Sequence, residues 1–374
     1  ACLIQYADNG GLLPRGACSG GYSFIMTGCP ATNMLVSTYM KDLMKKTKPS
    51  HAYEAIKRNH APGGMMSYES ADDLKFYVKK GYCPGNAGKT LEWAFQDWGL
   101  SRMALRMGKK SDAALYEKRS RAWTPLFNKN IGLILPKKEN GEWLHTDPLN
   151  GQGWVEANAW QATWSVSHDL PKLVELMGGG DAFCEKLNYA FEQARPTDFV
   201  HAYSGGYVSY ANQPGCSNAH LFTYGGQPWL TQYWVRQVKE HAYGGITPDK
   251  GYGGHDEDEG QMGAVSALMS LGLFSVTGTE YDIPYYDITS PIFDKITIKL
   301  NKDYYSGDEF VINVHNNSAD NCYIQKAELN GTDWIYAQLD HVDFAKGGTL
   351  NLWLGNMPNK SWGKLKYLGF KTNK

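Results

Sequence analysis

The sequence predicts a mainly α-helical region followed by a small antiparallel β domain, and two observations carry this prediction. From about residue 29 to residue 273, stretches of helical composition alternate with Gly- and Pro-rich loops. After about Thr279 the chain changes to short segments in which apolar and polar residues alternate, separated by Asn, Gly and Asp turns. We therefore expect a helical part over residues 1–279 and a β-sandwich-like module over residues 280–374.

Nine segments of the first part are expected to form helices. One has a clear end, because Met177 is followed by three glycines, which stop a helix. An α/α barrel is built from twelve helices in six hairpins, so either this region is built differently or its first helices are missing. The expected helices cover residues 31–45, 51–59, 71–79, 89–107, 111–123, 156–177, 181–194, 227–243 and 261–273.

The second part contains four segments with the alternation of half-buried strands. They read "DKITIKL", "DEFVINVHN", "CYIQKAELNG" and "TLNLWLG". Turn residues separate them, as in a small antiparallel sheet.

Composition excludes several classes of protein. The net charge is −1 and there is no basic run, which argues against nucleic acids and anionic membrane surfaces as partners. No stretch approaches the roughly 18 apolar residues of a membrane span. The chain begins at Ala1 with neither Met nor a signal peptide, so we expect a processed or truncated chain. Seven irregularly spaced cysteines predict neither a disulfide framework nor a zinc site.

Aromatic residues are abundant, with 12 Trp and 24 Tyr, many of them in polar loops. A core accounts for part of this surplus. The remainder favours a carbohydrate-binding protein, because aromatic rings at clefts stack on the apolar faces of sugars.

Four consecutive acidic residues stand in the glycine-rich segment "YGGHDEDEGQM", residues 252–262. An EF-hand loop starting at Asp256 would place Gln261 where glycine is required and Ala267 where glutamate is required, so that interpretation fails. A solvated turn remains possible. Asp256 and Asp258, two positions apart, would face the same side of an extended segment, as one side of a catalytic pair does.

Glu156 stands at the expected start of a helix, close in sequence to Trp154, Trp160 and Trp164. Partial desolvation by these rings would favour the protonated carboxyl, which suits a general acid. The alternative is an acidic residue that merely stabilises a helix N-terminus. His168 follows in the same segment and is, by itself, more typical of a structural histidine.

Amide side chains and aromatic residues are interleaved in the segment of residues 210–238. Their neutral oxygens suit sugar hydroxyls or a hard cation, although a polar loop with capping duties has the same composition. Two separated carboxylate groups and aromatic loops together are typical of glycoside hydrolases. The residues alone leave open whether the reaction retains or inverts configuration.

Three long blocks in this order resemble glycoside hydrolase family 92, the calcium-dependent exo-α-mannosidases. They are "EANAWQATWSVSHDLPKLVELMGG", "ANQPGCSNAHLFTYGGQPWLTQYWVR" and "GHDEDEGQMGAVSALMSLGLFSV". Weaker similarity extends through "GGLLPRG", "GYCPGNAGKTLEWAFQDWGL" and "NNSADNCYIQKAELNG", over nearly the whole chain.

The resemblance implies an (α/α)6 barrel and inverting removal of terminal α-mannose from glycans. It implies Glu156 as general acid and Asp258 as general base, with Asp256 as the alternative base. It implies a Ca²⁺ ion held with the help of Asn212 and Gln213, and a secreted, periplasmic or cell-surface location. The substrate-binding residues that it implies are Trp154, Asn158, Trp160, His168, Asn212, Gln213, Gln227 and Trp229.

Departures from the family pattern keep a second hypothesis open. Gln213 stands where the family has a carboxylate, and "GCPAT" at residues 28–32 replaces a segment with a His/Asp pair. The family's N-terminal β-sandwich and first barrel helices have no counterpart here. The alternative is therefore a non-catalytic mannose-glycan-binding protein, or one subunit of a split enzyme whose missing part a second polypeptide supplies.

Overall fold

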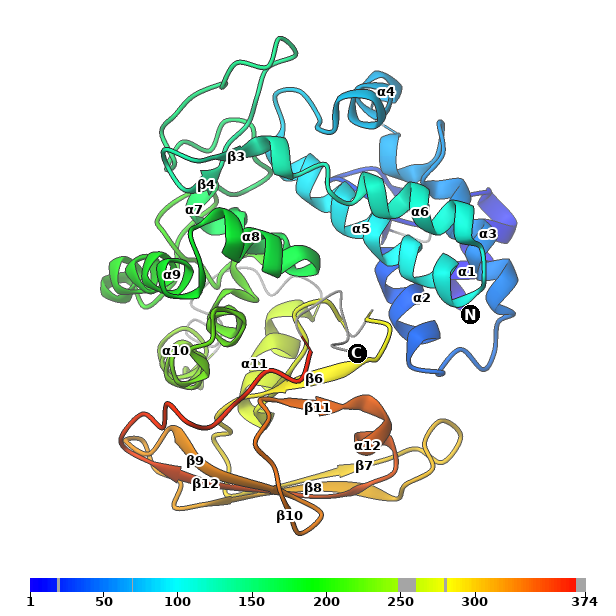
Figure 1. Ribbon diagram of the computed structural model, residues 1–374. Helices are drawn as coiled ribbons and strands as arrows, with labels where there is room; N and C mark the ends of the chain where they lie inside the picture. Colours follow the sequence, from blue (N-terminus) through cyan, green and yellow to red (C-terminus); the bar gives the residue numbers. More distant parts are fainter. Residues whose placement is uncertain (19–20, 69, 248–259, 279–280, 368–374) are drawn as a thin grey trace. The chain divides into compact units, whose positions relative to one another are not determined.

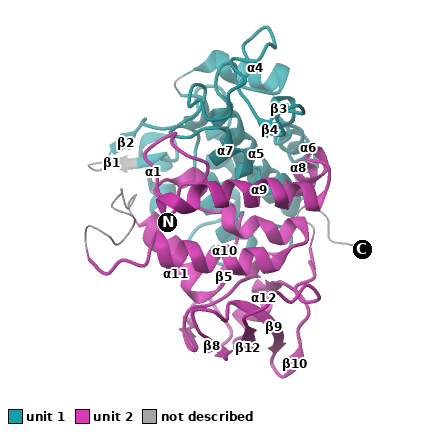
Figure 2. Ribbon diagram, turned by 90° about the vertical axis from the view of Figure 1, so that its left-hand side faces the viewer, with its two compact units in different colours: residues 1–169, 277–283 teal, residues 170–276, 284–374 magenta. Residues whose placement is uncertain are grey.

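A computed structural model describes residues 1–18, 21–68, 70–247, 260–278 and 281–367 (Figure 1). The chain divides into two compact units, coloured separately in Figure 2. Unit 1 comprises residues 1–169 and 277–283, and unit 2 comprises residues 170–276 and 284–374. Neither unit ends at residue 279, so the proposed boundary between a barrel and a β module stays a prediction.

Unit 1 is helical, with two very small antiparallel sheets, β1–β2 and β3–β4. Its first helix lies before the first helix that we expected. The α-helices are α1 (Cys2–Gly10), α2 (Ala31–Met40), α3 (Pro49–Asn59), α4 (Ala71–Lys80), α5 (Ala87–Arg106), α6 (Lys110–Arg119) and α7 (Ala159–Ala162). The 3₁₀ helices are η1 (Met65–Ser67), η2 (Thr124–Leu126), η3 (Thr163–Ser165) and η4 (Ser167–Asp169), and the strands are β1 (Gly16–Cys18), β2 (Gly21–Ser23), β3 (Phe127–Asn128) and β4 (Leu133–Ile134).

Local sequence signals explain where these helices begin and end. The Ser70 hydroxyl accepts the N–H of Asp73 at the start of α4, and the Asn86 side chain accepts the N–H of Lys89 at the start of α5. Helix α2 stops at Met40, short of the expected residue 45, because Asp42 adopts a left-handed backbone with φ 59°.

The long helix expected over residues 156–177 does not form. Instead the chain passes through α7, η3 and η4 before it enters α8 (Leu170–Leu176). The Asn158 side chain caps α7 by accepting the N–H of Gln161, so the helix begins three residues after Glu156. Periodicity alone missed this break, because residues 157–164 and 166–170 are all buried and have no exposed face that would mark a helical period.

Unit 2 starts with helices and ends with strands. Its remaining helices are α9 (Gly180–Ala194), η5 (Arg195–Thr197), η6 (Gln213–Gly215), η7 (Asn218–Gly225), α10 (Pro228–His241), α11 (Gln261–Leu271) and α12 (His341–Ala345). The strands are β5 (Leu273–Phe274), β6 (Tyr285–Ile288), β7 (Lys295–Lys299), β8 (Glu309–His315), β9 (Tyr323–Leu329), β10 (Thr332–Asp333), β11 (Gln338–Asp340) and β12 (Gly348–Gly355). None of the helices among the described residues has the length and apolar character needed to cross a membrane.

The strands form a five-stranded sheet, in the order β10-β9-β12-β8-β7, and a three-stranded sheet, β11-β6-β5. The expectation of a purely antiparallel domain is wrong in one place, because β12 runs parallel to β8. Helix α12 precedes β12 and returns the chain so that the last strand enters the sheet in the parallel direction. Alternating side chains of β8 and β12 are buried in one core, including Phe310, Ile312, Leu350 and Leu352.

Asp287 on β6 is a fully buried carboxyl that accepts hydrogen bonds from the Tyr224 hydroxyl at 3.1 and 3.2 Å. Burial raises the pKa of Asp287 to about 8, although the hydrogen bonds from Tyr224 and Gln338 lower it. Since the folded-state pKa is raised, the associated stability is present below about pH 3.8 and is lost as the pH rises towards 8.

Replacing Asp287 by asparagine is expected to remove this pH dependence while it keeps an acceptor for Tyr224. As the pH rises from about 3.8 to about 8, the free energy of unfolding of the wild type should fall, relative to that of Asp287→Asn, by up to about 1.4 kcal/mol per pH unit. Urea denaturation at a series of pH values measures the difference. Asp303→Asn, at an exposed aspartate before β8, is the control. Equal pH slopes in wild type and Asp287→Asn would contradict the assignment.

Candidate active site

Glu156 lies in a tight loop and has a left-handed backbone, with φ 50°. Such a conformation costs a non-glycine residue on the order of 1 kcal/mol or more, and strained positions of this kind concentrate at functional sites. The residue is half-buried, next in the chain to buried Ala157 and Asn158. Because α7 begins only at Ala159, Glu156 is not the first-turn acid that the alternative interpretation required.

The loop that carries Glu156 is fixed to the start of α5. Gly153 accepts the N–H of Ala87 at 2.8 Å, and its backbone has φ 83°. A Cβ at Gly153 would lie 2.7 Å from Pro136 and 2.9 Å from the carbonyl oxygen of Gly85, so only glycine fits there. These contacts determine where the chain enters the turn at Glu156.

Buried tryptophans surround this loop in the sequence, as expected. Trp154 and Trp160 are less than a tenth exposed, and Trp164 is fully buried. The indole N–H of Trp164 donates to the carbonyl of Trp160 at 2.7 Å, which ties η3 to α7. The indole nitrogen of Trp154 is buried and has no hydrogen-bond partner among the described residues.

His168 has the environment of a structural histidine. Its side chain is fully buried, and Nε2 lies 2.9 Å from the carbonyl oxygen of Ser120, to which it donates. The rings of Phe95 and Trp98 lie 5.8 and 6.0 Å away. Burial lowers the pKa of His168 to about 4, so the ring is neutral at physiological pH. The contact of His168 with substrate, which the resemblance implies, stays a prediction.

Asn212 and Gln213 form one turn of unit 2. The Asn212 side-chain oxygen accepts the backbone N–H of Gln213 at 3.0 Å and caps η6. Asn212 is buried and Gln213 is partly exposed. The cap fixes the orientation of the Asn212 carbonyl oxygen.

The start of α11 packs against this same turn. Cys216, at the end of the turn, has its sulfur 3.9 Å from the sulfur of Met262, and the Tyr243 hydroxyl lies 3.4 Å from the same Met262 sulfur. Met262 is the second residue of α11 and follows Asp258 by four positions. The structure thus brings the first turn of α11 beside the Asn212 turn within unit 2.

Asp256 and Asp258 lie outside the described residues, so their predicted role is untested by the geometry. The two remaining expected site residues have partners inside unit 2. The Gln227 amide donates to Asp181 at 3.0 Å, and the ammonium of Lys360 lies 5.5 Å from the centre of the Trp229 ring. Neither contact excludes a sugar from the exposed part of these side chains.

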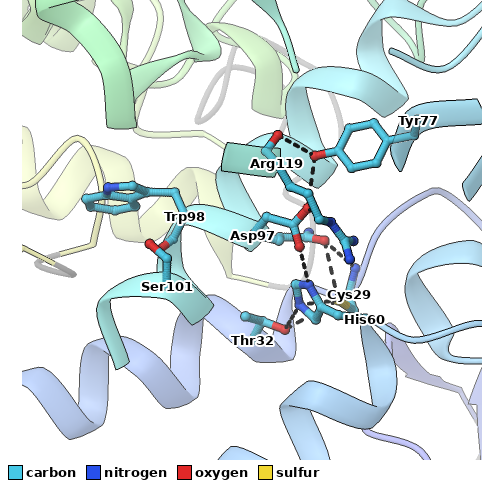
Figure 3. Close-up of polar contacts among 9 residues, drawn as sticks. Cys29, Thr32, His60, Tyr77, Asp97, Trp98, Ser101 and Arg119 are labelled. Atoms are coloured by element: carbon cyan, nitrogen blue, oxygen red, sulfur yellow. Dashed lines mark hydrogen bonds and ion pairs between the residues drawn. The ribbon is translucent and has the colours of Figure 1, made fainter. Parts of the chain in front are cut away.

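A buried polar cluster in unit 1 was missed by the sequence analysis (Figure 3). The Asp97 carboxylate accepts hydrogen bonds from His60 Nδ1 at 2.8 Å, the Tyr77 hydroxyl at 3.0 Å and Arg119 Nε at 2.7 Å. Asp97 and His60 are fully buried. On its other side the His60 ring meets Thr32 at 3.0 Å and Cys29 at 3.3 Å.

The cluster sets the protonation of His60. Burial lowers its pKa, but the neighbouring Cys29 and the Asp97 carboxylate raise it, and the outcome is a pKa raised to about 9. Cys29 and Thr32 belong to the "GCPAT" segment that departs from the family pattern. That departure was the only sequence signal for this cluster, since its other members are the residue that follows α3 and one residue each of α4, α5 and α6.

The described residues provide neutral oxygen donors for a cation. They contain no group of three His, Cys, Asp or Glu side chains arranged to hold a metal ion. The amide oxygens of Asn212 and Gln213 are hard donors, and Ca²⁺ accepts such oxygens together with carboxylates and water. The Asn212 oxygen, fixed by its cap, is therefore compatible with a Ca²⁺ site as one member of a larger ligand set.

Comparisons with known proteins agree with the sequence resemblance. A structure of an inverting family GH92 mannosidase from Bacteroides thetaiotaomicron matches with a TM-score of 0.83 and 31% identity, covering 96% of this chain and 50% of that one. A second structure from the same organism, a family GH92 α-mannosidase, matches with a TM-score of 0.85 and 24% identity over 100% of this chain and 49% of that one.

A curated relative from Arthroderma benhamiae, described as an uncharacterized secreted glycosidase, is 27% identical over 403 aligned residues. The alignment covers 97% of this chain and 49% of the relative, so the chain spans about half the length of the proteins that it matches. Residues 1–356 match the glycosyl hydrolase family 92 catalytic domain. The chain therefore belongs to glycoside hydrolase family 92.

Proposed function

We propose that this chain acts in an exo-α-mannosidase that hydrolyses terminal α-linked mannose of glycans with inversion. The match of residues 1–356 to a family 92 catalytic domain is the observation that carries the proposal. The inverting mannosidase that is 31% identical supports the stereochemistry. We also propose that the helical part, residues 1–279, contributes to an (α/α)6 barrel and that residues 280–374 form its β module.

Glu156 is the general acid of the proposed reaction. Its carboxyl protonates the oxygen that leaves with the rest of the glycan, while the bond to the anomeric carbon breaks. The fixed loop at Gly153 and the left-handed turn position the backbone that carries this carboxyl. A pre-positioned acid lowers the entropy that is lost in reaching the transition state.

Asp258 is the proposed base, with Asp256 as the alternative. It removes a proton from the water that attacks the opposite face of the sugar, which inverts the anomeric configuration. An inverting pair requires the two carboxyl groups to stand about 6.5–9.5 Å apart, which leaves room for this water. The residues proposed to bind the mannoside are Trp154, Asn158, Trp160, Asn212, Gln213, Gln227 and Trp229.

Asn212 and Gln213 are proposed to contribute oxygens to a Ca²⁺ ion. When bound, Ca²⁺ supplies a hard positive centre that attracts the hydroxyl oxygens of the terminal mannose. The family membership and the secreted relative also support a location outside the cytoplasm, in the secreted, periplasmic or cell-surface fraction.

Release of mannose from an aryl α-mannoside and from mannan, measured with purified chain and added Ca²⁺, tests the proposal. Proton NMR during the first turnovers should detect β-mannose as the initial product. A chain that releases mannose only after a second polypeptide is added would support a split enzyme, because the chain is half the length of its relatives. Binding of mannan without hydrolysis in either arrangement would favour the glycan-binding alternative.

Removing calcium is expected to abolish hydrolysis and to lower the melting temperature. Ligands that bind the folded state stabilise it by mass action, so Ca²⁺ should raise the melting temperature in a concentration-dependent way. Asn212→Ala should weaken this Ca²⁺-dependent shift, whereas Asn140→Ala, at an exposed position of unit 1, should leave it unchanged. Full activity in excess EGTA would contradict the calcium proposal.

A further inference from the structure

Unit 2 contains a cavity of about 730 Å³ between one face of α10 and the start of β9. Four of its lining residues, Tyr233, Arg236, Gln237 and Glu240, follow the i, i+3, i+4, i+7 spacing of a single helix face. Tyr323 and Asp320 line the opposite side. None of these residues belongs to the proposed mannosidase site, and the volume falls in the range of about 300–1,000 Å³ of small-molecule sites.

Two tyrosine rings form the aromatic part of the cavity. The rings of Tyr233 and Tyr323 are nearly parallel, with an interplanar angle of 6° and centroids 6.4 Å apart. Both side chains are only partly buried, so each retains exposed ring surface in the cavity lining. Parallel aromatic rings suit flat ligands with apolar faces, such as pyranose rings.

Contacts from behind the cavity hold this arrangement before any ligand binds. Arg195 donates to the Tyr233 hydroxyl at 3.0 Å and to the Gln237 side-chain oxygen at 3.1 Å. Arg236 donates to the carbonyl of Ser318 at 2.5 Å and to Asn317 Oδ1 at 3.2 Å, and thereby ties α10 to the loop before β9. The side chains of Tyr233, Arg236 and Gln237 therefore have little entropy left to lose on binding.

The polar side chains of the lining favour an uncharged ligand. Arg236 and Lys239 are balanced by Glu240 and Asp320, so the lining has no net charge. Among the described residues, the side chains of Glu240, Asp320 and Asn356 have no hydrogen-bond partner. They are therefore available to a ligand as acceptors or donors. Carboxylates and an amide of this kind bind sugar hydroxyls, whereas a phosphate group would require an excess of cations.

We propose that this cavity is an accessory binding site for a neutral oligosaccharide segment, distinct from the site of hydrolysis. The ligand stacks a pyranose face on the Tyr233–Tyr323 pair and directs hydroxyls to Asp320, Glu240 and Asn356. Such a site retains a branched or polymeric glycan on unit 2 between successive cleavages. Because binding here involves no bond cleavage, it can be tested even if the chain proves inactive.

Isoleucine methyl NMR can read this site separately from the active site, because Ile292 lines the cavity. The probe is an S-linked α-mannotriose, which resists hydrolysis. It is titrated into protein labelled at the isoleucine δ1 methyl groups. The signal that disappears in Ile292→Val is assigned to Ile292. The Ile292 signal should shift saturably with the mannotriose and should not respond to inorganic phosphate. Tyr323→Ala should weaken this binding about tenfold or more.

Two controls separate stacking from general effects. Tyr323→Phe keeps the ring and should bind within about twofold of wild type, and Tyr304→Ala, at a partly buried tyrosine between β7 and β8, should bind as wild type does. If Tyr323→Ala does not fold, Asp320→Ala on the exposed loop replaces it and should weaken binding. An Ile292 signal unmoved by the mannotriose, or equal affinity in wild type and Tyr323→Ala or Asp320→Ala, overturns the proposal.

Discussion

Glu156→Gln is expected to lower the turnover of natural mannosides by about 10²–10⁴-fold, the range typical for loss of a general acid. Glutamine has the same shape as glutamate and can occupy the same loop, but it has no acidic proton to give to the leaving oxygen. Thermal unfolding should therefore remain close to that of wild type. Initial rates on mannan with added Ca²⁺ measure the loss.

The leaving group decides whether the effect comes from proton donation. A 2,4-dinitrophenyl mannoside releases a stable phenolate and needs little protonation, so Glu156→Gln should lose much less activity on it than on mannan. Glu139→Gln, at an exposed glutamate of unit 1, should behave as wild type on both substrates. Equal losses on the two substrates would exclude Glu156 as the acid.

Asp97→Ala is expected to destabilise unit 1 by about 3–5 kcal/mol, the range found when one partner of a buried ion pair is removed. The substitution would leave Arg119 and protonated His60 without their shared carboxylate in a region that water does not reach. Tryptophan fluorescence during urea denaturation reports on this region, because Trp93 and Trp98 on α5 are fully buried. Asp72→Ala, at an exposed aspartate of α4, should have no measurable effect.

The pH dependence provides a further test of the same cluster. Since the folded-state pKa of His60 is raised, its contribution to stability is fully present below about pH 6.5 and is lost as the pH rises through about 9. Asp97→Asn removes the carboxylate and should reduce the slope of stability against pH in this window. An Asp97→Asn variant as stable as wild type, with an unchanged slope, would show that the cluster is uncharged.

Helix positions were largely predictable because capping residues and apolar spacing are local signals. Ser70 and Asn86 cap helix starts, and the first two glycines after Met177 donate to carbonyls of the last turn of α8, each through a contact within a few residues. The break before α8 was not predictable, because η3 and η4 are held by contacts with residues distant in sequence, Thr163 with Ile134 and His168 with Ser120. The parallel pairing of β8 and β12 was missed for the same reason, since pairing direction depends on the path of the whole chain.

The candidate site was predictable only in part. The sequence blocks identified Glu156 and the Asn212 turn. The structure added the left-handed conformation of Glu156 and the contact between the Asn212 turn and Met262. The network around Asp97 could not be foreseen, because hydrogen bonds between side chains of several helices leave no periodic pattern. Free cysteines commonly pack as small apolar residues, and here five of them are buried: Cys29, Cys83, Cys184, Cys216 and Cys322.

Because of the left-handed backbone at residue 156, the amino acid that gives the highest stability differs from the one that gives the highest activity. Glycine and asparagine adopt this conformation more readily than glutamate, so selection for thermal stability alone should favour them there. Selection for hydrolysis should restore the carboxyl in spite of the strain. A deep mutational scan that reads folding and turnover separately would therefore rank the amino acids at residue 156 in nearly opposite orders.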